Sequence, residues 1–268
     1  MAEKPLILRV LGSGAFAPEP ARLGESFRAP GPTERGRRVR NPAGYALQTP
    51  GGVLLFDFGF GNLRQLYRAG LESSLVTHAF FTHRHPDHVG DLAALLFQFH
   101  YDAKPCGGEL RVYGPEGFAA FWDRLRAAYG PWLEPKGYRL IVSELPSGGS
   151  VEGPGWRVSA RAVPHPTPAV AYRFDAPGGS LCYTGDTGYD PAIARFARGV
   201  DLLVLECTLP DRARYKGHLR VGEAIRLARA AKAKRVLFSH LSEASVADAR
   251  GRLPSNVRLA RDLQRLRL

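Results

Sequence analysis

The residues best suited to chemistry lie in one short segment, Thr82-His83-Arg84-His85-Pro86-Asp87-His88. A hydrophobic run typical of a strand precedes it, and a helical pattern follows it. In extended backbone His83 and His85 project to the same side, whereas Asp87 and His88 come at the next turn and address a second point in space. Alternating imidazole and carboxylate ligands suit two adjacent divalent ions of borderline softness, zinc foremost.

Two ions need more ligands than this segment supplies. Three isolated side chains of the right type each follow a strand-like run: His165, Asp186 and His240. The ends of strands are where α/β sheets place their sites. A lone histidine at a strand end is ordinarily structural, but five of the eight histidines fit this one pattern. The pattern therefore favours a metal centre built from distant parts of the chain.

The elements that must position these side chains alternate between strands and helices. Strand-like runs lie at 6–11, 45–49, 53–58, 78–82, 110–113, 139–143, 156–163, 170–174, 180–184, 202–206 and 235–239. Helical patterns lie at 90–100, 115–129, 221–231 and 257–268. This alternation predicts an α/β sandwich of sheets flanked by helices, in a single domain over residues 1–268. A long basic loop, rich in Gly and Pro, is expected at about 12–42.

Composition excludes several classes of protein. With 268 residues, 44% of them hydrophobic, the chain can bury a core and is not disordered. No apolar run reaches the ~18–20 residues of a membrane span, and no signal peptide is apparent, so we expect a cytoplasmic protein without membrane contact. The net charge of +12 has two possible explanations: a bias in composition, or binding of an anionic partner. The four clustered arginines of the long loop suit such a partner: Arg35, Arg37, Arg38 and Arg40.

Taken together, these residues resemble the metallo-β-lactamase superfamily of binuclear metallohydrolases. The resemblance implies a four-layer αβ/βα sandwich for the whole chain. It also implies that His83, His85 and His165 hold one ion, and that Asp87, His88 and His240 hold the other. Asp186 would bridge both ions. True β-lactamases usually carry Cys in place of Asp186, which argues against antibiotic hydrolysis.

Other segments resemble the ribonuclease Z-like phosphodiesterases of this superfamily, among them Leu11-Gly-Ser-Gly14, Asp57-Phe-Gly-Phe-Gly61, Val112-Tyr-Gly-Pro-Glu-Gly117 and Glu206-Cys-Thr208. By this resemblance Asp57 supports a ligand histidine, and His218 protonates the leaving oxygen while Glu206 orients it. The alternative for the last pair is purely structural. Only twenty residues, 166–185, separate His165 from Asp186. That leaves no room for the tRNA-gripping arm of full tRNA-processing members, so a more compact phosphodiesterase is expected.

The expected reaction is hydrolysis of a phosphodiester, in RNA or a cyclic nucleotide, by a hydroxide bridging two divalent ions, Zn²⁺ or else Mn²⁺ or Fe. Asp87 would help to orient the hydroxide, and the arginines of the long loop would hold distal phosphates. Two alternatives stay open. One is a hydrolase of the same fold that cleaves a thioester, lactone or sulfate ester. The other is a basic nucleic-acid-binding protein with a structural metal. Dimers are common among such relatives, so a homodimer is also expected.

Overall fold

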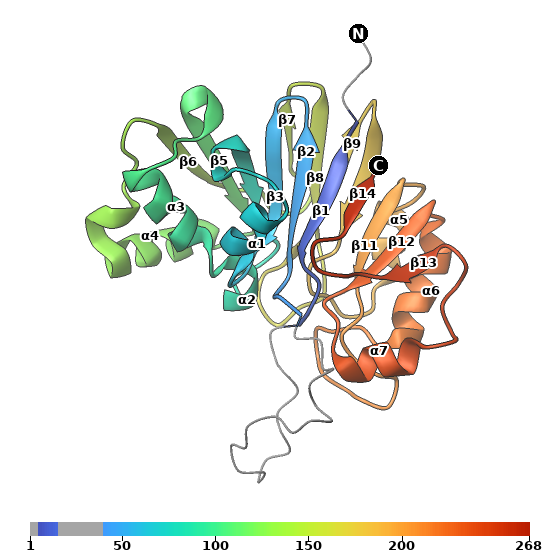
Figure 1. Cartoon of the computed structure of the whole chain (residues 1–268). Coiled ribbons are helices and arrows are strands. Elements are labelled where there is room, and N and C mark those ends of the chain that lie inside the picture. Colours follow the sequence, from blue (N-terminus) through green and yellow to red (C-terminus); the bar gives the residue numbers. More distant parts are fainter. Residues whose placement is uncertain (1–4, 16–39) are drawn as a thin grey trace, which may run out of the picture.

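The computed structural model describes residues 5–15 and 40–268, and its framework is a pair of seven-stranded mixed sheets (Figure 1). The first sheet has the order β14 (Arg265–Arg267), β1 (Ile7–Gly12), β2 (Gly44–Thr49), β3 (Gly52–Phe58), β4 (Val76–Phe80), β5 (Glu109–Gly114) and β6 (Arg139–Glu144). The second has the order β7 (Ser150–Gly153), β8 (Trp156–Ala162), β9 (Val170–Ala176), β10 (Gly179–Tyr183), β11 (Leu202–Glu206), β12 (Arg235–Ser239) and β13 (Val257–Leu259). In the order given, each sheet pairs its first four strands antiparallel and the rest parallel.

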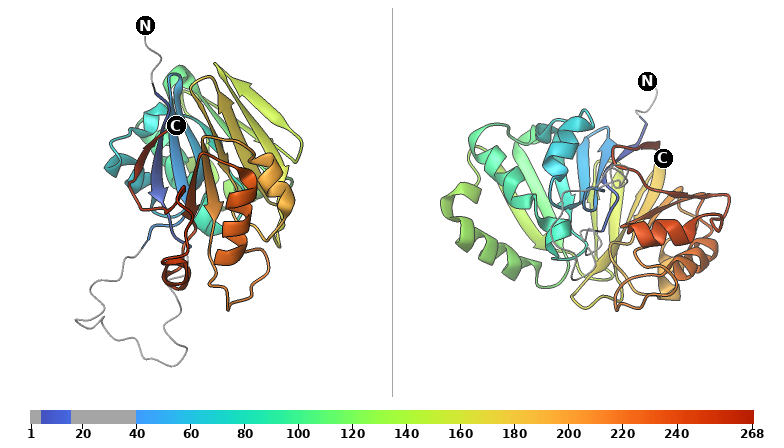
Figure 2. Two further views of the ribbon diagram at one scale, coloured as in Figure 1. Left: turned by 90° about the vertical axis from the view of Figure 1, so that its right-hand side faces the viewer. Right: turned by 60° about the horizontal axis from the view of Figure 1, so that its bottom comes forward.

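Helices cover the outer faces of both sheets (Figures 1 and 2). The first sheet carries α1 (Asn62–Arg68), α2 (Pro86–Val89), α3 (Leu92–Tyr101) and α4 (Phe118–Tyr129), with short 3-10 turns at Ser73–Leu75, Cys106–Gly108 and Gly130–Leu133. The second sheet carries α5 (Pro191–Phe196), α6 (Val221–Ala231) and α7 (Glu243–Ala249). Among the residues described, no helix combines the length and the apolar character that a membrane crossing requires.

The hydrophobic core has three layers, one between the two sheets and one beneath the helices on each outer face. Successive side chains of a strand point to opposite faces of its sheet, so each strand contributes to two of these layers. In β3, Leu54 and Phe56 pack between the two sheets, whereas Leu55 packs against the helices. In β12, Leu237 faces the other sheet and Phe238 faces the outer helices. Strands buried on both faces read as continuous hydrophobic runs rather than as alternating ones. The expected four-layer sandwich is therefore confirmed.

Most predicted elements are confirmed, but the C-terminal helix is wrong. The helix predicted at 221–231 and the strands at 202–206 and 235–239 have those bounds in the structure. The apolar spacing at 257–268 mimics a helix, yet Val257 pairs with Val236 at the edge of the second sheet and Leu266 pairs with Leu8 in the first. A turn with Leu263 at φ 62° separates these two strands. Sheet pairing with distant strands thus overrides the local helical spacing.

Candidate metal centre and active site

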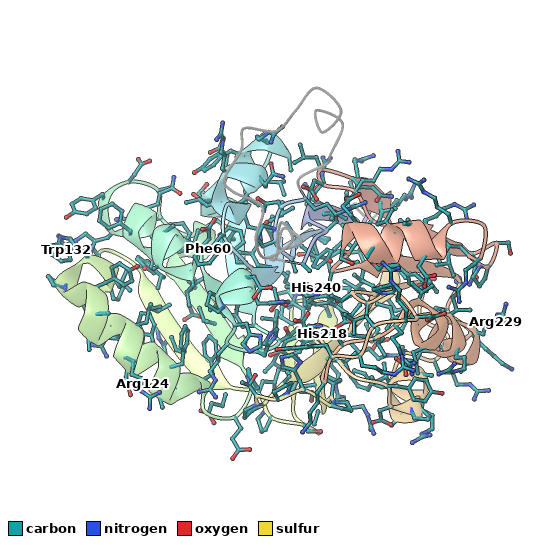
Figure 3. The ribbon with its side chains drawn as sticks, turned by 90° about the horizontal axis from the view of Figure 1, so that it is seen from below. Phe60, Arg124, Trp132, His218, Arg229 and His240 are labelled. Atoms are coloured by element: carbon teal, nitrogen blue, oxygen red, sulfur yellow. The ribbon has the colours of Figure 1, made fainter. Side chains whose placement is uncertain are left out.

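The predicted ligands meet at one edge of the sandwich because each follows a strand. His83 and His85 lie in the loop after β4, and the one-turn helix α2 carries Asp87 and His88. Pro86 occupies the first turn of α2, where a proline costs no hydrogen bond. His165, Asp186 and His240 follow β8, β10 and β12. Viewed from that edge, His240 and His218 lie between the two helical layers (Figure 3).

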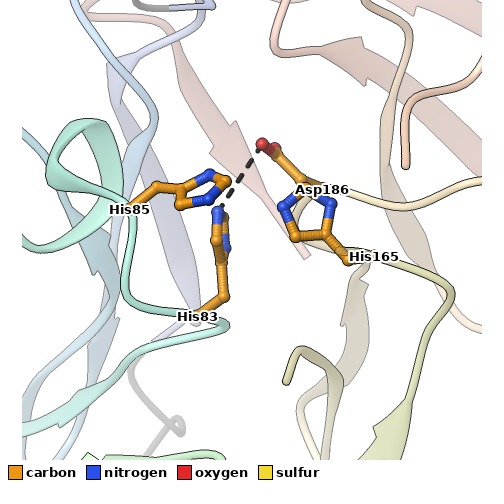
Figure 4. A group of neighbouring side chains, drawn as sticks. All are labelled: His83, His85, His165 and Asp186. Atoms are coloured by element: carbon orange, nitrogen blue, oxygen red, sulfur yellow. Dashed lines mark ion pairs between the residues drawn. The ribbon is translucent and has the colours of Figure 1, made fainter. Parts of the chain in front are cut away.

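The first cluster consists of His83, His85, His165 and Asp186 (Figure 4). One potential ligand atom from each of the four lies within 4.8 Å of the others. Nε2 of His83 is 3.7 Å from Oδ2 of Asp186. Three imidazoles and one carboxylate at this spacing form the donor set of a divalent transition-metal site.

The second cluster consists of Asp87, His88, Asp186 and His240. Oδ1 of Asp186 lies 3.3 Å from Nε2 of His88 and 3.3 Å from Nε2 of His240. Oδ2 of Asp87 lies 3.5 Å and 3.4 Å from the same two nitrogens. Because Asp186 presents Oδ2 to the first cluster and Oδ1 to the second, its carboxylate lies between the two.

Unpartnered polar atoms show that both clusters fit metal ions. The Nε2 atoms of His83, His88 and His165, together with Oδ1 of Asp186, are buried without a hydrogen-bond partner in the described part of the chain. Leaving four such atoms unsatisfied in the interior is costly. Cations bound among them would satisfy all four, so the buried His/Asp clusters are consistent with a binuclear metal site.

The protonation states of Asp186 and His83 suit metal binding, whereas a metal ion at His88 must displace a proton. Burial alone would lower the pKa of His88, but the charges of Asp186 and Asp57 outweigh it and raise that pKa well above the ordinary value. Burial by itself would raise the pKa of Asp186, but the nearby His240 and His88 hold that pKa well below its usual range. Burial, reinforced by the charge of His88, lowers the pKa of His83 well below the ordinary value. An ionised carboxylate and a neutral imidazole are the forms that bind metals.

Asp57 is the central acceptor beneath the second cluster, where sequence reasoning placed a supporting carboxylate. Its Oδ2 accepts hydrogen bonds from Nδ1 of His88 at 2.7 Å, from the Tyr183 hydroxyl at 2.7 Å and from the Thr82 hydroxyl at 2.8 Å. Its Oδ1 accepts from the Thr82 amide at 2.7 Å. Asp57 is fully buried and has a φ of 53°, a conformation that non-glycine residues adopt rarely.

Thr208 supports His240 in the same manner. Its hydroxyl donates to the carbonyl oxygen of His240 at 3.0 Å and lies 2.7 Å from Nδ1 of the same residue. With that hydrogen used, Oγ1 accepts from Nδ1–H, so in the neutral ring Nε2 of His240 is the nitrogen that can bind a metal. Sequence reasoning assigned no role to Thr208, Thr82 or Tyr183. The only available indication was that Thr208 follows Glu206-Cys207 and that Thr82 precedes the histidine segment.

Glu206 and His218 form a third group beside the clusters. Nδ1 of His218 lies 2.6 Å from Oε1 of Glu206 and 4.0 Å from Oδ2 of Asp186. Oε2 of the buried Glu206 accepts from the Leu219 amide at 2.7 Å. Burial alone would lower the pKa of His218, but the hydrogen bond and charge of Glu206 outweigh it and raise that pKa to about 9. The ring is thus oriented, and its protonated form is favoured.

The long basic loop at about 12–42 is described only at its two ends, residues 12–15 and 40–42. The Arg40 guanidinium donates to Oγ of Ser13 at 2.8 Å and to the carbonyl oxygen of Ala260 at 2.7 Å. These contacts attach Arg40 to the framework of the sandwich. The other predicted substrate-binding arginines, Arg35, Arg37 and Arg38, lie outside the described residues.

Comparison with known proteins identifies a matching family and several relatives. The family model "Beta-lactamase superfamily domain" matches residues 53–241. Ribonuclease BN of Cronobacter sakazakii is 27% identical over 71% of this chain and 79% of its own length. An uncharacterised protein of Mycobacterium bovis is 31% identical over 74% of each chain.

Solved structures agree on the fold. The metallo-β-lactamase fold protein YhfI of Bacillus subtilis superposes with a TM-score of 0.77 at 20% identity, covering 98% of this chain and 100% of its own. The short form of human tRNase Z superposes with a TM-score of 0.74 at 23% identity, covering 97% of this chain and 98% of its own. A diphosphatase of the PhnP family superposes with a TM-score of 0.74 at 22% identity, covering 97% of each chain.

The family match covers β3 through β12 and so contains every predicted metal ligand, from His83 to His240. The double-sheet sandwich and the shared Asp186 between two buried clusters agree with that match. The chain belongs to the metallo-β-lactamase superfamily, with distant similarity to the ribonuclease Z and ribonuclease BN enzymes.

Proposed function

We propose that this protein is a binuclear metal-dependent phosphodiesterase, with zinc as its metal and RNA or a cyclic nucleotide as its substrate. The observation that carries the proposal is the Glu206–His218 pair, whose nitrogen and oxygen lie 2.6 Å apart beside Asp186. An oriented, protonated imidazole at the edge of a metal centre suits a reaction in which a poor leaving group must gain a proton. The alkoxide of a phosphodiester is such a group.

Each ligand set has its own place in this proposal. His83, His85 and His165 would hold one ion, Asp87, His88 and His240 would hold the other, and Asp186 would serve both. When bound, the two ions supply a nucleophilic hydroxide at neutral pH and stabilise the charge that develops on the phosphoryl oxygens.

The protein's own groups orient and protonate the reactants. Asp87 is the more exposed carboxylate of the centre, with 14% of its side chain accessible against 2% for Asp186. Its carboxylate would accept a hydrogen bond from the attacking water and orient it. Glu206 occupies Nδ1 of His218, so Nε2 is the atom that delivers the proton to the leaving oxygen.

Two further observations support a compact phosphodiesterase. The relatives and similar structures include proteins named as ribonucleases and as a diphosphatase. In addition, β9 and β10 form a tight hairpin in which Ala176 pairs with Gly179. This hairpin occupies the stretch between His165 and Asp186, where the sequence leaves no room for a gripping arm. A substrate held near the metal centre therefore fits better than one held by a distant arm.

The test compares two leaving groups in protein of measured metal content. One substrate is bis-p-nitrophenyl phosphate, whose leaving group is a stable anion, and the other is a dinucleotide, whose leaving group is an alkoxide. Asp186→Ala should abolish turnover of both. His218→Ala should lower kcat on the dinucleotide by about 10²- to 10⁴-fold and change the rate on the p-nitrophenyl ester far less.

The outcomes are distinct. Two metals per chain with this split would support the phosphodiesterase. Equal losses of activity on the two substrates would remove His218 as the proton donor. Two metals without turnover of either substrate would overturn the proposal and favour a thioester, lactone or sulfate ester as the substrate.

A further inference from the structure

The loop between β11 and α6 carries a group of side chains that the proposed reaction does not use. Directly before Gly217-His218 stand Arg212, Arg214, Tyr215 and Lys216, which we call the 212–216 strip. All four side chains are exposed, and Tyr215 is 69% exposed, the largest fraction among the large hydrophobic residues described. The strip therefore presents one exposed aromatic ring among three cations.

The strip lies next to the proposed proton donor. The ring centroid of Tyr215 is 5.6 Å from that of His218, with 34° between the planes. His218 also stacks on His240, with centroids 5.5 Å apart and 4° between the planes. Tyr215, His218 and His240 thus form a row that leads from the surface to the metal centre. A group attached to the leaving oxygen at His218 comes within reach of Tyr215.

The base of the loop is fixed to the sandwich. Asp211 accepts from the Gly222 amide at 2.7 Å and pairs with Arg252 at 2.5 Å. Arg214 donates to the carbonyl oxygens of Asp211 and Ala213, which stiffens the turn. Because the acidic residue of the loop is engaged at its base, the exposed face of the strip presents positive charge and an aromatic ring.

A second tyrosine of the same kind lies on the neighbouring loop. Tyr189, three residues after Asp186, is 42% exposed, and the Arg226 guanidinium lies 5.0 Å from the centre of its ring. The two loops are neighbours, since the space beside Cα of Gly188 is bounded by Cα of Gly217. Two exposed tyrosine rings thus lie on neighbouring loops, Tyr215 among three cations and Tyr189 beside Arg226.

We propose that the 212–216 strip is a binding surface for single-stranded nucleic acid, with Tyr215 stacking on the base attached to the leaving oxygen. Aromatic rings that stack on bases, combined with cations that track the backbone, are how proteins hold single strands. A base must be unstacked to reach such a ring, so a duplex is disfavoured. The direction in which the nucleic acid lies rests on the proposed function, because it depends on His218 facing the leaving group. The assignment of the 212–216 strip as a binding surface does not depend on that function.

The test measures binding, so it does not depend on turnover. A fluorescein-labelled single-stranded 2′-O-methyl oligonucleotide is titrated against the full-length, zinc-loaded chain, and its anisotropy is followed. Tyr215→Ala should weaken binding by about tenfold, the value expected for one stacked base. Tyr215→Phe should bind like the wild type. Tyr129→Ala removes a half-exposed tyrosine at the end of α4 and serves as the matched control.

A second experiment tests whether the positive charge of the 212–216 strip contacts the phosphates. Lys216→Gln should reduce the salt dependence of log K by about 0.7, the contribution of one phosphate contact with a single strand. Equal binding by Tyr215→Ala and wild type would overturn the proposal, as would equal loss in Tyr215→Ala and Tyr129→Ala. A preference for the duplex over the single strand would also overturn it. If the proposed phosphodiesterase activity is wrong, the dinucleotide assay shows no turnover. The binding results can still be interpreted in that case.

Discussion

Oδ2 of Asp57 lies 2.7 Å from Nδ1 of His88, although the two residues are 31 positions apart in the chain. Since the carboxylate can only accept, Nδ1 carries a hydrogen, and in the neutral ring Nε2 is the nitrogen whose lone pair faces Asp87 and Asp186. One buried carboxylate thus determines the tautomer of a proposed metal ligand. The same oxygen accepts from Tyr183, so it also connects the two sheets.

Asp57→Asn should weaken metal binding at the second cluster. The amide keeps only one accepting oxygen, so its NH2 group faces either the donors now at Oδ2 or the Thr82 amide now at Oδ1, and at least one buried donor loses its partner. Loss of such a supporting partner typically costs about 10- to 100-fold in metal affinity. Competition with a chromophoric chelator measures this affinity. Unchanged affinity for both ions would contradict the role assigned to Asp57.

Thr208→Val should lower affinity at the same cluster through His240. Valine keeps the shape of threonine but removes the acceptor for Nδ1–H, so the ring is no longer held with Nε2 toward Asp87 and Asp186. We expect a loss of about tenfold in metal affinity. Thr208→Ser retains the hydroxyl and is the matched control. Equal losses in the two variants would show that packing of the methyl group, not the hydrogen bond, is what matters.

The Glu206–His218 pair predicts a pH dependence in metal-free protein. The folded pKa of His218, about 9, lies above the ordinary histidine value of about 6.5. The ion pair therefore stabilises the fold fully below the ordinary value, and this stability is lost as the pH rises through about 9. Urea denaturation in the presence of chelator should show this decline, and His218→Gln should flatten it. An equally steep decline in that variant would assign the effect to other groups.

The core between the sheets predicts the largest loss of stability. Phe56 is fully buried, with its ring 5.3 Å from that of Phe80 and 6.3 Å from that of Tyr172 in the opposite sheet. Phe56→Ala should lower the free energy of unfolding by about 3–5 kcal/mol. Phe97→Ala, at a position 50% exposed on α3, should change it by less than about 0.5 kcal/mol. Denaturation of both variants at one metal concentration checks the contrast.

The clustering of the proposed ligands could be predicted from the sequence because much of the pattern is local. His83, His85, Asp87 and His88 stand in one segment, and the geometry of a strand followed by a turn separates them into two clusters. Their supports were harder to predict. Tyr183 reaches Asp57 across 126 residues, a pairing that only the packed sandwich creates. The same holds for the chain end, where the spacing of Leu259, Leu263 and Leu266 predicted a helix and two distant sheets instead take up the segment.

The pairing of β14 with β1 has a consequence for the order in which the molecule can be completed. Leu8 and its antiparallel partner, Leu266, lie 258 positions apart in the chain. During synthesis β1 therefore emerges long before β14, and its outer edge waits with unpaired amides and carbonyls, which invite pairing with other chains. Deletion of β14 would leave the proposed metal ligands in place and expose that edge permanently. This short strand thus protects the nascent protein against aggregation, although it lies outside the chemistry.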